Sequence, residues 1–354
     1  MGVNKKCLRE QPEWYKIEEY AMVTKKIRRG IKMSFNLSVL MPVIISFLVS
    51  VVLCPIIIPF LRKMKFGQTE RDDGPESHLK KSGTPTMGGL VILASILITS
   101  LVYIGRYKDI IPVLFMTLGF GIIGFLDDYI KVVMKRSLGL TPMQKMALQF
   151  VVTGIFVFYY FHVANMAPTI RIPFVEGAGF TMPGWLFVIF VFIVVLGTVN
   201  GVNFTDGLDG LASGVTAIVA TFFTLAALML NSNMTPITGA VVGSLLGFLL
   251  FNTYPARVFM GDTGSLALGG FVSSIALMLH IPLFIVIVGL IYLMEVLSVI
   301  IQVGYFKLTH GKRIFKMAPI HHHFELCGYS ETQVVAAFSV ATALLCLVGV
   351  MALY

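Results

Sequence analysis

Carboxylate side chains stand in short motifs between long apolar stretches of this sequence. Asp127 and Asp128 are adjacent, and Lys131 follows one helical turn later. Two adjacent carboxylates about 6 Å apart repel by about 3 kcal/mol at an effective dielectric constant of about 20, unless a cation offsets the repulsion. We therefore expect a cation here. Lys131 could supply part of it, and Mg²⁺ suits carboxylate and phosphate oxygens. The simpler alternative is a solvated helix cap.

A second motif, residues 200–210, reads Asn-Gly-Val-Asn-Phe-Thr-Asp-Gly-Leu-Asp-Gly. Asn203, Asp206 and Asp209 offer hydrogen-bonding groups, and the glycines allow a close backbone approach. Such groups suit a uracil N–H, ribose hydroxyls or a hydrated cation. The alternative is a turn rich in Asn and Asp.

A third motif covers residues 252–265, from Asn252 to the sequence Phe-Met-Gly-Asp-Thr-Gly-Ser that contains Phe259 and Asp262. Asp262 stands just before a predicted helix N-terminus, where exposed amides and the helix dipole favour phosphate. Its carboxylate could bring Mg²⁺ to that phosphate, and Phe259 could stack on a base. A single Gly-Asp-x-Gly is weak evidence alone, but it is the third acidic motif of this kind.

Histidines and basic residues supply groups of the opposite polarity. Residues 321–323 are three successive histidines, which point in different directions on any regular backbone. A three-histidine metal site is therefore not expected, whereas His321 and His322 could donate to phosphate oxygens. Lys81 and Thr86 precede another predicted helix N-terminus, and Lys145 adds a cation near the membrane surface.

Two further polar residues lie on an apolar stretch. Glu295 and Gln302 are seven residues apart and so lie near one helical face. For Glu295, the alternative to a functional role is a hydrogen bond between helices.

Composition indicates that these motifs belong to a membrane protein. Of 354 residues, 56% are hydrophobic and only 13% are charged, with a mean hydropathy of +0.86. The net charge of +9 is explained by basic residues bordering apolar spans, so no nucleic-acid partner is expected. The four cysteines show no paired spacing, which indicates neither a disulfide framework nor a zinc site.

The apolar stretches predict an all-α integral membrane protein of about ten transmembrane helices, because only helices satisfy the backbone in lipid without the alternation of a barrel. The predicted spans are Leu37–Leu61, Met87–Ile104, Ile110–Leu126, Ala147–Val163, Trp185–Val199, Leu211–Leu230, Ile237–Phe251, Leu266–His280, Leu283–Tyr305 and Val334–Leu353.

The connecting segments fall into two sets of unequal charge. One set holds fifteen Lys or Arg, and the other holds only Arg106, Lys108 and Arg171. The positive-inside rule therefore predicts that the first set is cytoplasmic, and it contains all three acidic motifs. Five cytoplasmic loops are expected to form the active site: residues 62–86, 127–146, 200–210, 252–265 and 306–333.

The domain prediction is a single ten-helix transmembrane domain over residues 34–354. Residues 1–33 form a polar, basic extension, which this orientation would leave outside the cytoplasm. Met33 is therefore a hypothetical alternative start, so residues 1–33 are a candidate non-native segment.

Taken together, the motifs resemble the phospho-N-acetylmuramoyl-pentapeptide transferases of bacterial peptidoglycan synthesis. The resemblance covers residues 34–354 through Thr-Pro-Thr-Met-Gly-Gly, Asp-Asp-x-x-Lys, Asn-x-x-Asn-x-Thr-Asp-Gly-Leu-Asp-Gly, Phe-Met-Gly-Asp-Thr-Gly-Ser and His-His-His-Phe-Glu. It implies transfer of phospho-muramoyl-pentapeptide from its UDP carrier to undecaprenyl phosphate, giving lipid I and UMP with Mg²⁺. It also implies a multi-pass protein of the bacterial cytoplasmic membrane that forms a homodimer.

The resemblance also implies roles for individual residues. Asp262 matches the principal Mg²⁺ ligand, and Asp127 and Asp128 match the catalytic pair at the lipid phosphate and metal. The remaining matches lie around the nucleotide, its diphosphate and the polar site: Lys81, Thr86, Lys131, Lys145, Asn203, Asp206, Asp209, Asn252, Phe259, Gln302, His321 and His322.

The sequence leaves alternatives for the substrate, the mechanism and the class of protein. Transferases of N-acetylglucosamine phosphate share the aspartate motifs, although the Pro-Ile-His-His-His-Phe-Glu form resembles the muramoyl branch. The expected reaction is direct attack by the lipid phosphate, which Asp127 deprotonates or orients, and the alternative is a covalent aspartyl intermediate. A lipid or ion transporter is a rival class, but it should carry ionisable residues near the bilayer midplane, where only Glu295 is expected.

Overall fold

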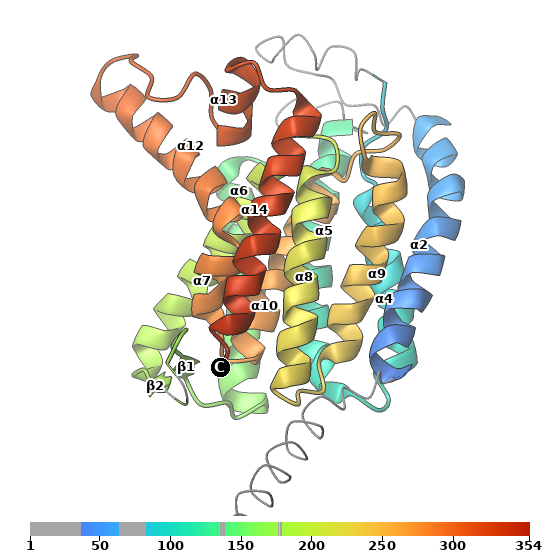
Figure 1. Cartoon of the computed structure of the whole chain (residues 1–354), viewed down its shortest axis with the longest axis vertical. Helices are drawn as coiled ribbons and strands as arrows, with labels where there is room; N and C mark the ends of the chain where they lie inside the picture. Colours follow the sequence, from blue (N-terminus) through green and yellow to red (C-terminus); the bar gives the residue numbers. More distant parts are fainter. Residues whose placement is uncertain (1–36, 64–82, 133, 135–138, 176, 178) are drawn as a thin grey trace, which may run out of the picture.

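The protein is a bundle of long helices, seen here in a computed structural model that describes residues 37–63, 83–132, 134, 139–175, 177 and 179–354 (Figure 1). The helices of the described part are α2 (Leu37–Lys63), α4 (Gly89–Tyr103), α5 (Ile111–Val132), α6 (Pro142–Phe158), α7 (Gly184–Thr205), α8 (Leu211–Met229), α9 (Thr235–Asn252), α10 (Gly261–Met278), α11 (Ile285–Val288), α12 (Leu290–Leu308), α13 (Ile320–Leu326) and α14 (Glu331–Met351). Short helical turns are η1 (Lys108–Ile110), η2 (Tyr159–Val163) and η3 (Pro282–Phe284). Strands β1 (Thr169–Arg171) and β2 (Gly179–Thr181) pair antiparallel, with Ile170 opposite Phe180.

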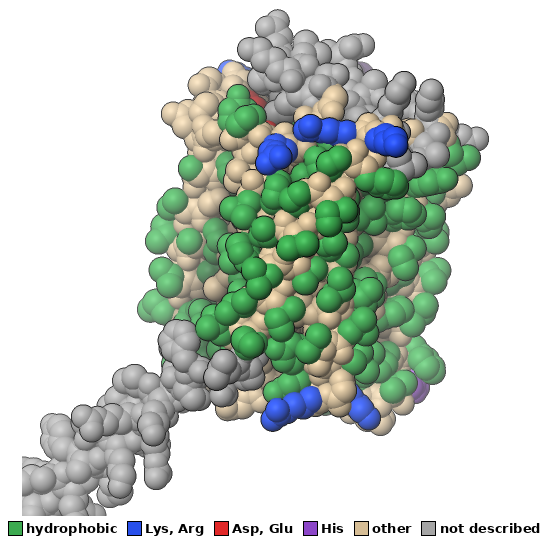
Figure 2. All heavy atoms as spheres, turned by 90° about the vertical axis from the view of Figure 1, so that its right-hand side faces the viewer, with side chains coloured by type: hydrophobic (Ala, Val, Ile, Leu, Met, Phe, Trp, Pro, Cys, Tyr) green, Lys and Arg blue, Asp and Glu red, His purple; other side chains and the backbone are tan. Residues whose placement is uncertain are grey.

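The helices confirm the prediction of an all-α membrane protein. Within the described residues, 8 helices are long and apolar enough to cross a membrane. Figure 2 shows hydrophobic side chains covering the middle of one face, with Lys and Arg side chains above and below that band. The helix α4 is apolar but shorter, so the count of ten spans stays a prediction.

The helix α10 runs through the interior of the bundle and packs against α5, α7 and α4. Every residue from Thr263 to Met278 is buried, so this part of the helix exposes no surface to lipid. Its small residues allow close packing: Gly269 lies against the backbone of Val199, and Gly270 lies against Met116 and Phe120. This packing fixes the ends of α5, α7 and α10 relative to one another.

Three helices continue into the polar motifs, where the predicted spans ended or began at the membrane edge. The helix α5 reaches Val132, α7 reaches Thr205, and α10 already begins at Gly261. The predicted boundaries at Leu126, Val199 and Leu266 were therefore wrong. Hydropathy changes at the first polar residue, whereas helical hydrogen bonds continue past it.

Two further elements differ from the sequence prediction. The predicted span Leu283–Tyr305 is divided into η3, α11 and α12, with the break at Gly289. The histidine motif, expected within the last cytoplasmic loop, forms the short helix α13 there. The helix α13 and the adjoining ends of α12 and α14 lie at one end of the bundle, and the β1–β2 hairpin lies at the other (Figure 1).

Two helices approach closely where Gly124 of α5 faces the backbone of Asp262 in α10. A Cβ atom at Gly124 would overlap the Asp262 carbonyl group, which cannot move as a side chain can. We expect Gly124→Ala to lower the free energy of unfolding by about 1 to 3 kcal/mol, because overpacking forces backbone shifts. Thermal unfolding of the purified protein in detergent measures the loss.

Gly154→Ala is the matched control for this prediction. Gly154 also lies within a helix, α6, but a Cβ atom there has no neighbour within 4 Å. The control should unfold at or above the wild-type temperature, because Ala favours helix over Gly. Equal unfolding temperatures for the two variants would contradict the proposed close approach of α5 and α10.

Candidate active site

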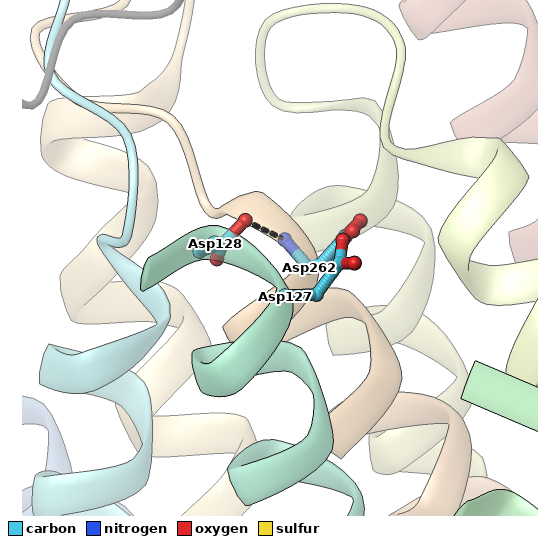
Figure 3. A group of neighbouring side chains, drawn as sticks. All are labelled: Asp127, Asp128 and Asp262. Carbon is cyan, nitrogen blue, oxygen red and sulfur yellow. Dashed lines mark hydrogen bonds between the residues drawn. The ribbon is translucent and has the colours of Figure 1, made fainter. Parts of the chain in front are cut away.

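Three carboxylates meet where α5 ends and α10 begins. Asp127 and Asp128 are buried in the last turns of α5, and Asp262 lies in the first turn of α10. One oxygen from each carboxylate lies within 4.8 Å of the others. Figure 3 shows the carboxylates of Asp127 and Asp262 side by side, while that of Asp128 points away from them. We call these residues the acidic cluster.

Two lysines neutralise part of the acidic cluster. Lys131 Nζ donates to Asp262 Oδ2 at 2.7 Å and forms an ion pair with Asp127 Oδ2. Lys145 Nζ donates to the same Asp262 oxygen at 3.0 Å and lies 3.7 Å from Asp127 Oδ2. Lys145 comes from α6, whose start is fixed by a capping box formed by Thr141 and Gln144. With three carboxylates and two ammonium groups, these five side chains together carry one net negative charge.

Neutral donors hold the remaining oxygens of Asp127 and Asp262 in place. Asn203 Nδ2, on the last turn of α7, donates to Asp262 Oδ1 at 2.7 Å and to Ser265 Oγ at 2.8 Å. The backbone N–H of Leu140 donates to Asp127 Oδ1 at 2.7 Å. Asp127 Oδ2 is buried and has no aligned hydrogen bond among the described residues, although it lies close to both lysines.

Asp128 joins α5 to the N-terminus of α10. Its Oδ2 accepts from the backbone N–H of Thr263 at 2.9 Å and from Thr263 Oγ1 at 2.6 Å, and its Oδ1 accepts from the N–H of Asp262 at 3.2 Å. A carboxylate at this position satisfies amides that lack partners within the helix and complements the helix dipole. Asp128 therefore orients Asp262.

The acidic cluster fits a divalent cation. Its donors are carboxylate oxygens, which hard cations such as Mg²⁺ prefer, and one of these oxygens lacks an aligned hydrogen bond. Asp127 and Asp262 point to the same side and could both reach one ion (Figure 3). Asp128 would contribute through its hold on α10, since both of its oxygens already accept backbone hydrogen bonds.

Thr86 and Phe259 lie beside the acidic cluster. The backbone N–H of Phe259 donates to Pro85 at 2.8 Å, and Gly88 N–H donates back to the Phe259 carbonyl at 2.8 Å. Thr86 is buried against Gly261, which has a φ of 71°. A Cβ atom at Gly261 would lie 2.8 Å from Thr86 Oγ1 and 2.7 Å from Asp128 Oδ2, so only glycine suits this turn.

Asp206 follows the last residue of α7 and is half-buried near the acidic cluster. Burial, and after it the negative charges of Asp262 and Asp128, raise the pKa of its carboxyl from 3.8 to about 8. The backbone N–H of Gly261 acts in the opposite direction. Without a bound cation, Asp206 therefore retains its proton near neutral pH.

Three of the expected binding residues hold loops together. Asn252 accepts from Ser213 Oγ at 2.6 Å and donates to the Val258 carbonyl at 3.0 Å. Asp209 Oδ2 accepts from the N–H of Ala256 at 2.8 Å. The Gln302 amide donates to the Phe315 carbonyl at 3.0 Å and accepts from the N–H groups of residues 314 and 315. These contacts shape the loops around the site.

The successive histidines of α13 have separate partners. His321 Nδ1 lies 3.1 Å from Glu295 Oε2, and His322 Nδ1 lies 2.8 Å from Glu325 Oε2. His323 Nδ1 accepts from the backbone N–H of Lys316 at 3.1 Å. Lys81, also expected at the site, lies outside the described residues.

Sequence reasoning missed three residues of the site. Thr263 and Ser265 contact the acidic cluster and Asn203, and their positions in Gly-Asp-Thr-Gly-Ser were the available signal. Glu331 Oε1 accepts from the backbone N–H of Asp209 at 2.6 Å. Nothing in the sequence links Glu331 to a residue 122 positions earlier.

Comparison with known proteins agrees with this geometry. Residues 110–280 match the model of glycosyl transferase family 4, and residues 81–93 match phospho-N-acetylmuramoyl-pentapeptide-transferase signature 1. A helical membrane bundle with a lysine-paired acidic cluster, together with the first match, defines an integral-membrane phosphoglycosyl transferase.

Full-length relatives identify the family. The phospho-N-acetylmuramoyl-pentapeptide-transferase of Acetivibrio thermocellus is 52% identical over 312 residues, which is 88% of this chain and 94% of the relative. Those of Bacillus subtilis and Clostridioides difficile are each 50% identical over 88% of this chain. The alignments cover 97% and 96% of these two relatives, respectively. The chain belongs to the phospho-N-acetylmuramoyl-pentapeptide-transferase family.

The raised pKa of Asp206 predicts a pH-dependent difference between wild type and Asp206→Asn. Between pH 3.8 and about 8 the folded state holds a proton that the unfolded state has lost, so this group lowers wild-type stability as pH rises. The Asn side chain of the variant does not titrate, so the variant does not lose stability in this way. Its unfolding temperature relative to wild type should therefore increase from pH 5 to pH 8, measured in detergent with a chelator.

The same comparison for Asp109→Asn supplies the control. Asp109 lies at the other end of the bundle, where its exposed carboxylate accepts from Asn233 Nδ2 at 2.9 Å. The change in the difference from wild type between pH 5 and pH 8 should be larger for Asp206→Asn than for Asp109→Asn. Equal changes for the two variants would contradict the raised pKa of Asp206.

Proposed function

We propose that this protein transfers phospho-N-acetylmuramoyl-pentapeptide from its UDP carrier to undecaprenyl phosphate, giving lipid I and UMP. The observation that carries the proposal is the lysine-paired acidic cluster in a chain about half identical to full-length transferases of this name. The same relatives favour the muramoyl substrate over N-acetylglucosamine phosphate. We further propose that the protein forms a homodimer in the bacterial cytoplasmic membrane. The acidic cluster is proposed to face the cytoplasm, because the loops on that side carry the excess of basic residues.

The charges of the site suit a reaction between two phosphates. Both substrates are anionic, so they repel each other unless cations lie between them. Lys131 and Lys145 converge on one oxygen of Asp262, and each ammonium group has other donor hydrogens for phosphate oxygens. A Mg²⁺ ion held by Asp262 would neutralise further phosphate charge and stabilise the departing UMP.

Asp127 is the proposed base. Its Oδ1 is fixed by Leu140, while Oδ2 lies on the side of the lysines and of Asp262. The carboxylate takes the proton of the undecaprenyl phosphate, whose oxygen then attacks the sugar-proximal phosphorus. A new P–O bond forms, the P–O bond to UMP breaks, and UMP leaves with the bonding electrons. Asp128 contributes by orienting Asp262.

The nucleotide is expected beside the acidic cluster. Asn203 donates to Asp262, and Asp206 lies near Gly261. Phe259 precedes Gly261 by two residues, and its ring is proposed to stack on the base. Lys81 is proposed to meet the diphosphate. Asp209, Asn252 and Gln302 support this surface through their loop contacts. His321 and His322 complete the proposed nucleotide site from α13.

Release of UMP from UDP-muramoyl-pentapeptide, undecaprenyl phosphate and Mg²⁺ tests the proposal in detergent. Asp127→Asn should lose the base and Asp262→Asn a cation ligand, so each should lower kcat by at least about a hundredfold. Asp109→Asn should retain wild-type turnover. Undiminished turnover in both cluster variants would remove the site from the mechanism.

Two parallel reactions separate the alternatives. UDP-N-acetylglucosamine in place of the muramoyl substrate should release no UMP, and faster release from it would assign the protein to the other branch. Single-turnover mixing without lipid acceptor should yield no phospho-enzyme, and trapping of one would replace direct attack with the covalent route.

Removal of divalent metal provides a separate test of the cofactor. Dialysis against a chelator should abolish UMP release, because five charged side chains alone leave the site short of positive charge. Mg²⁺ or Mn²⁺ should restore turnover to the same protein sample. Full turnover in the chelator would contradict a required metal.

A further inference from the structure

The fully buried carboxylate of Glu295 has no role in the mechanism given above. Glu295 lies in the second turn of α12, on the face that also buries Ile291, Tyr292 and Ser298. Its side chain is 0% exposed. A carboxylate inside a membrane protein is costly unless a partner compensates its charge, so its presence calls for a specific reason.

The partner of Glu295 is His321, the first histidine of α13. The imidazole is also buried, and its Nδ1 lies 3.1 Å from Glu295 Oε2. This distance is within ion-pair range, but the ring N–H is not aligned for a hydrogen bond. His322, whose ring centroid is 4.1 Å away, pairs with Glu325 instead.

The other nitrogen of His321 faces the motif that contains Asp206 and Asp209. A Cβ atom at Gly207 would overlap His321 Nε2, so the ring lies directly against the backbone between the two aspartates. Glycine at position 207 is what permits this approach. The interaction from α12 to α13 thus continues to the loop beside the acidic cluster.

Four buried polar atoms in this pair have no aligned hydrogen bond among the described residues: both carboxylate oxygens of Glu295 and both ring nitrogens of His321. Buried polar atoms nearly always have partners, so an exception often marks a functional site. The buried Nε2 lies against Gly207, so the pair acts on the substrate through the loop of residues 206–209.

We propose that Glu295 is a positioning residue that holds the imidazole of His321 against Gly207, so that the loop of residues 206–209 keeps the shape that receives the nucleotide. The inference rests on the proposed function, because that loop belongs to the proposed nucleotide site. A carboxylate beside one imidazole nitrogen fixes the orientation of the ring. Glu295 itself does not touch the substrate.

Glu295→Gln is the first test, because it keeps the shape and removes the charge. We expect kcat/KM for the UDP substrate to fall about 10- to 100-fold, as when other partners of functional histidines are lost. UMP affinity, measured by calorimetry in detergent, should fall as well, while KM for undecaprenyl phosphate stays within twofold. Unchanged UMP affinity would overturn the proposal.

Tyr292→Phe is the matched control. Tyr292 is buried on the same face of α12, and its hydroxyl donates to Thr216 Oγ1 at 2.8 Å. This variant should lower the unfolding temperature yet keep UMP affinity within twofold. An equal loss of UMP affinity in both variants would show that Glu295 serves only the packing of α12.

His321→Asn separates folding from recognition. The Asn amide can still donate to Glu295 from near the Nδ1 position, but it has no ring to pack against Gly207. We expect a near wild-type unfolding temperature with weak UMP binding, and adding Glu295→Gln should then weaken UMP binding by less than twofold more. Fully multiplicative losses would overturn the coupling between the two residues.

These measurements remain distinct from the test of the proposed function. If the wild-type protein binds UMP but releases none from UDP-muramoyl-pentapeptide, the proposed function fails. The effect of Glu295→Gln on UMP binding still decides the inference, since calorimetry requires no turnover.

Discussion

The mutual repulsion of Asp127, Asp128 and Asp262 is the constraint on which the described structure depends. Adjacent carboxylates in a partly buried site repel strongly unless cations or N–H donors compensate their charge. The charge of each carboxylate is compensated in a different way. Asp128 accepts hydrogen bonds from the N-terminus of α10, and Asp127 pairs with Lys131. Asp262 accepts hydrogen bonds from both lysines and from Asn203. Elements from α5, α6, α7 and α10 must therefore meet at one point.

Close helix packing makes that meeting possible. The small residues of α10 let α5 and α7 approach its backbone, and Gly124 brings the end of α5 directly onto Asp262. Because the interior helix is buried, the carboxylates are positioned by the packed ends of α5 and α10. The remaining charge deficit favours a cation and anionic substrates, which is the electrostatic requirement of phosphoryl transfer.

The sequence was sufficient for the membrane class, the grouping of the polar motifs and the family, because long apolar stretches and local motifs carry those signals. It was insufficient for contacts between distant segments. The capping of α10 by Asp128, the bond from Glu331 to Asp209 and the pairing of Glu295 with His321 each depend on tertiary packing. Helix ends were misplaced for a related reason, since hydropathy at Val199 does not reveal that α7 continues to Thr205.

Binding of Mn²⁺ to the substrate-free protein, followed by electron paramagnetic resonance, tests most directly whether the acidic cluster is a cation site. Wild-type protein should bind one Mn²⁺ per chain, with Mg²⁺ competing for it, and Asp262→Asn should lose this binding while remaining folded. Equal Mn²⁺ binding by wild type and the Asp262→Asn variant would contradict a cation site at the meeting point of α5 and α10.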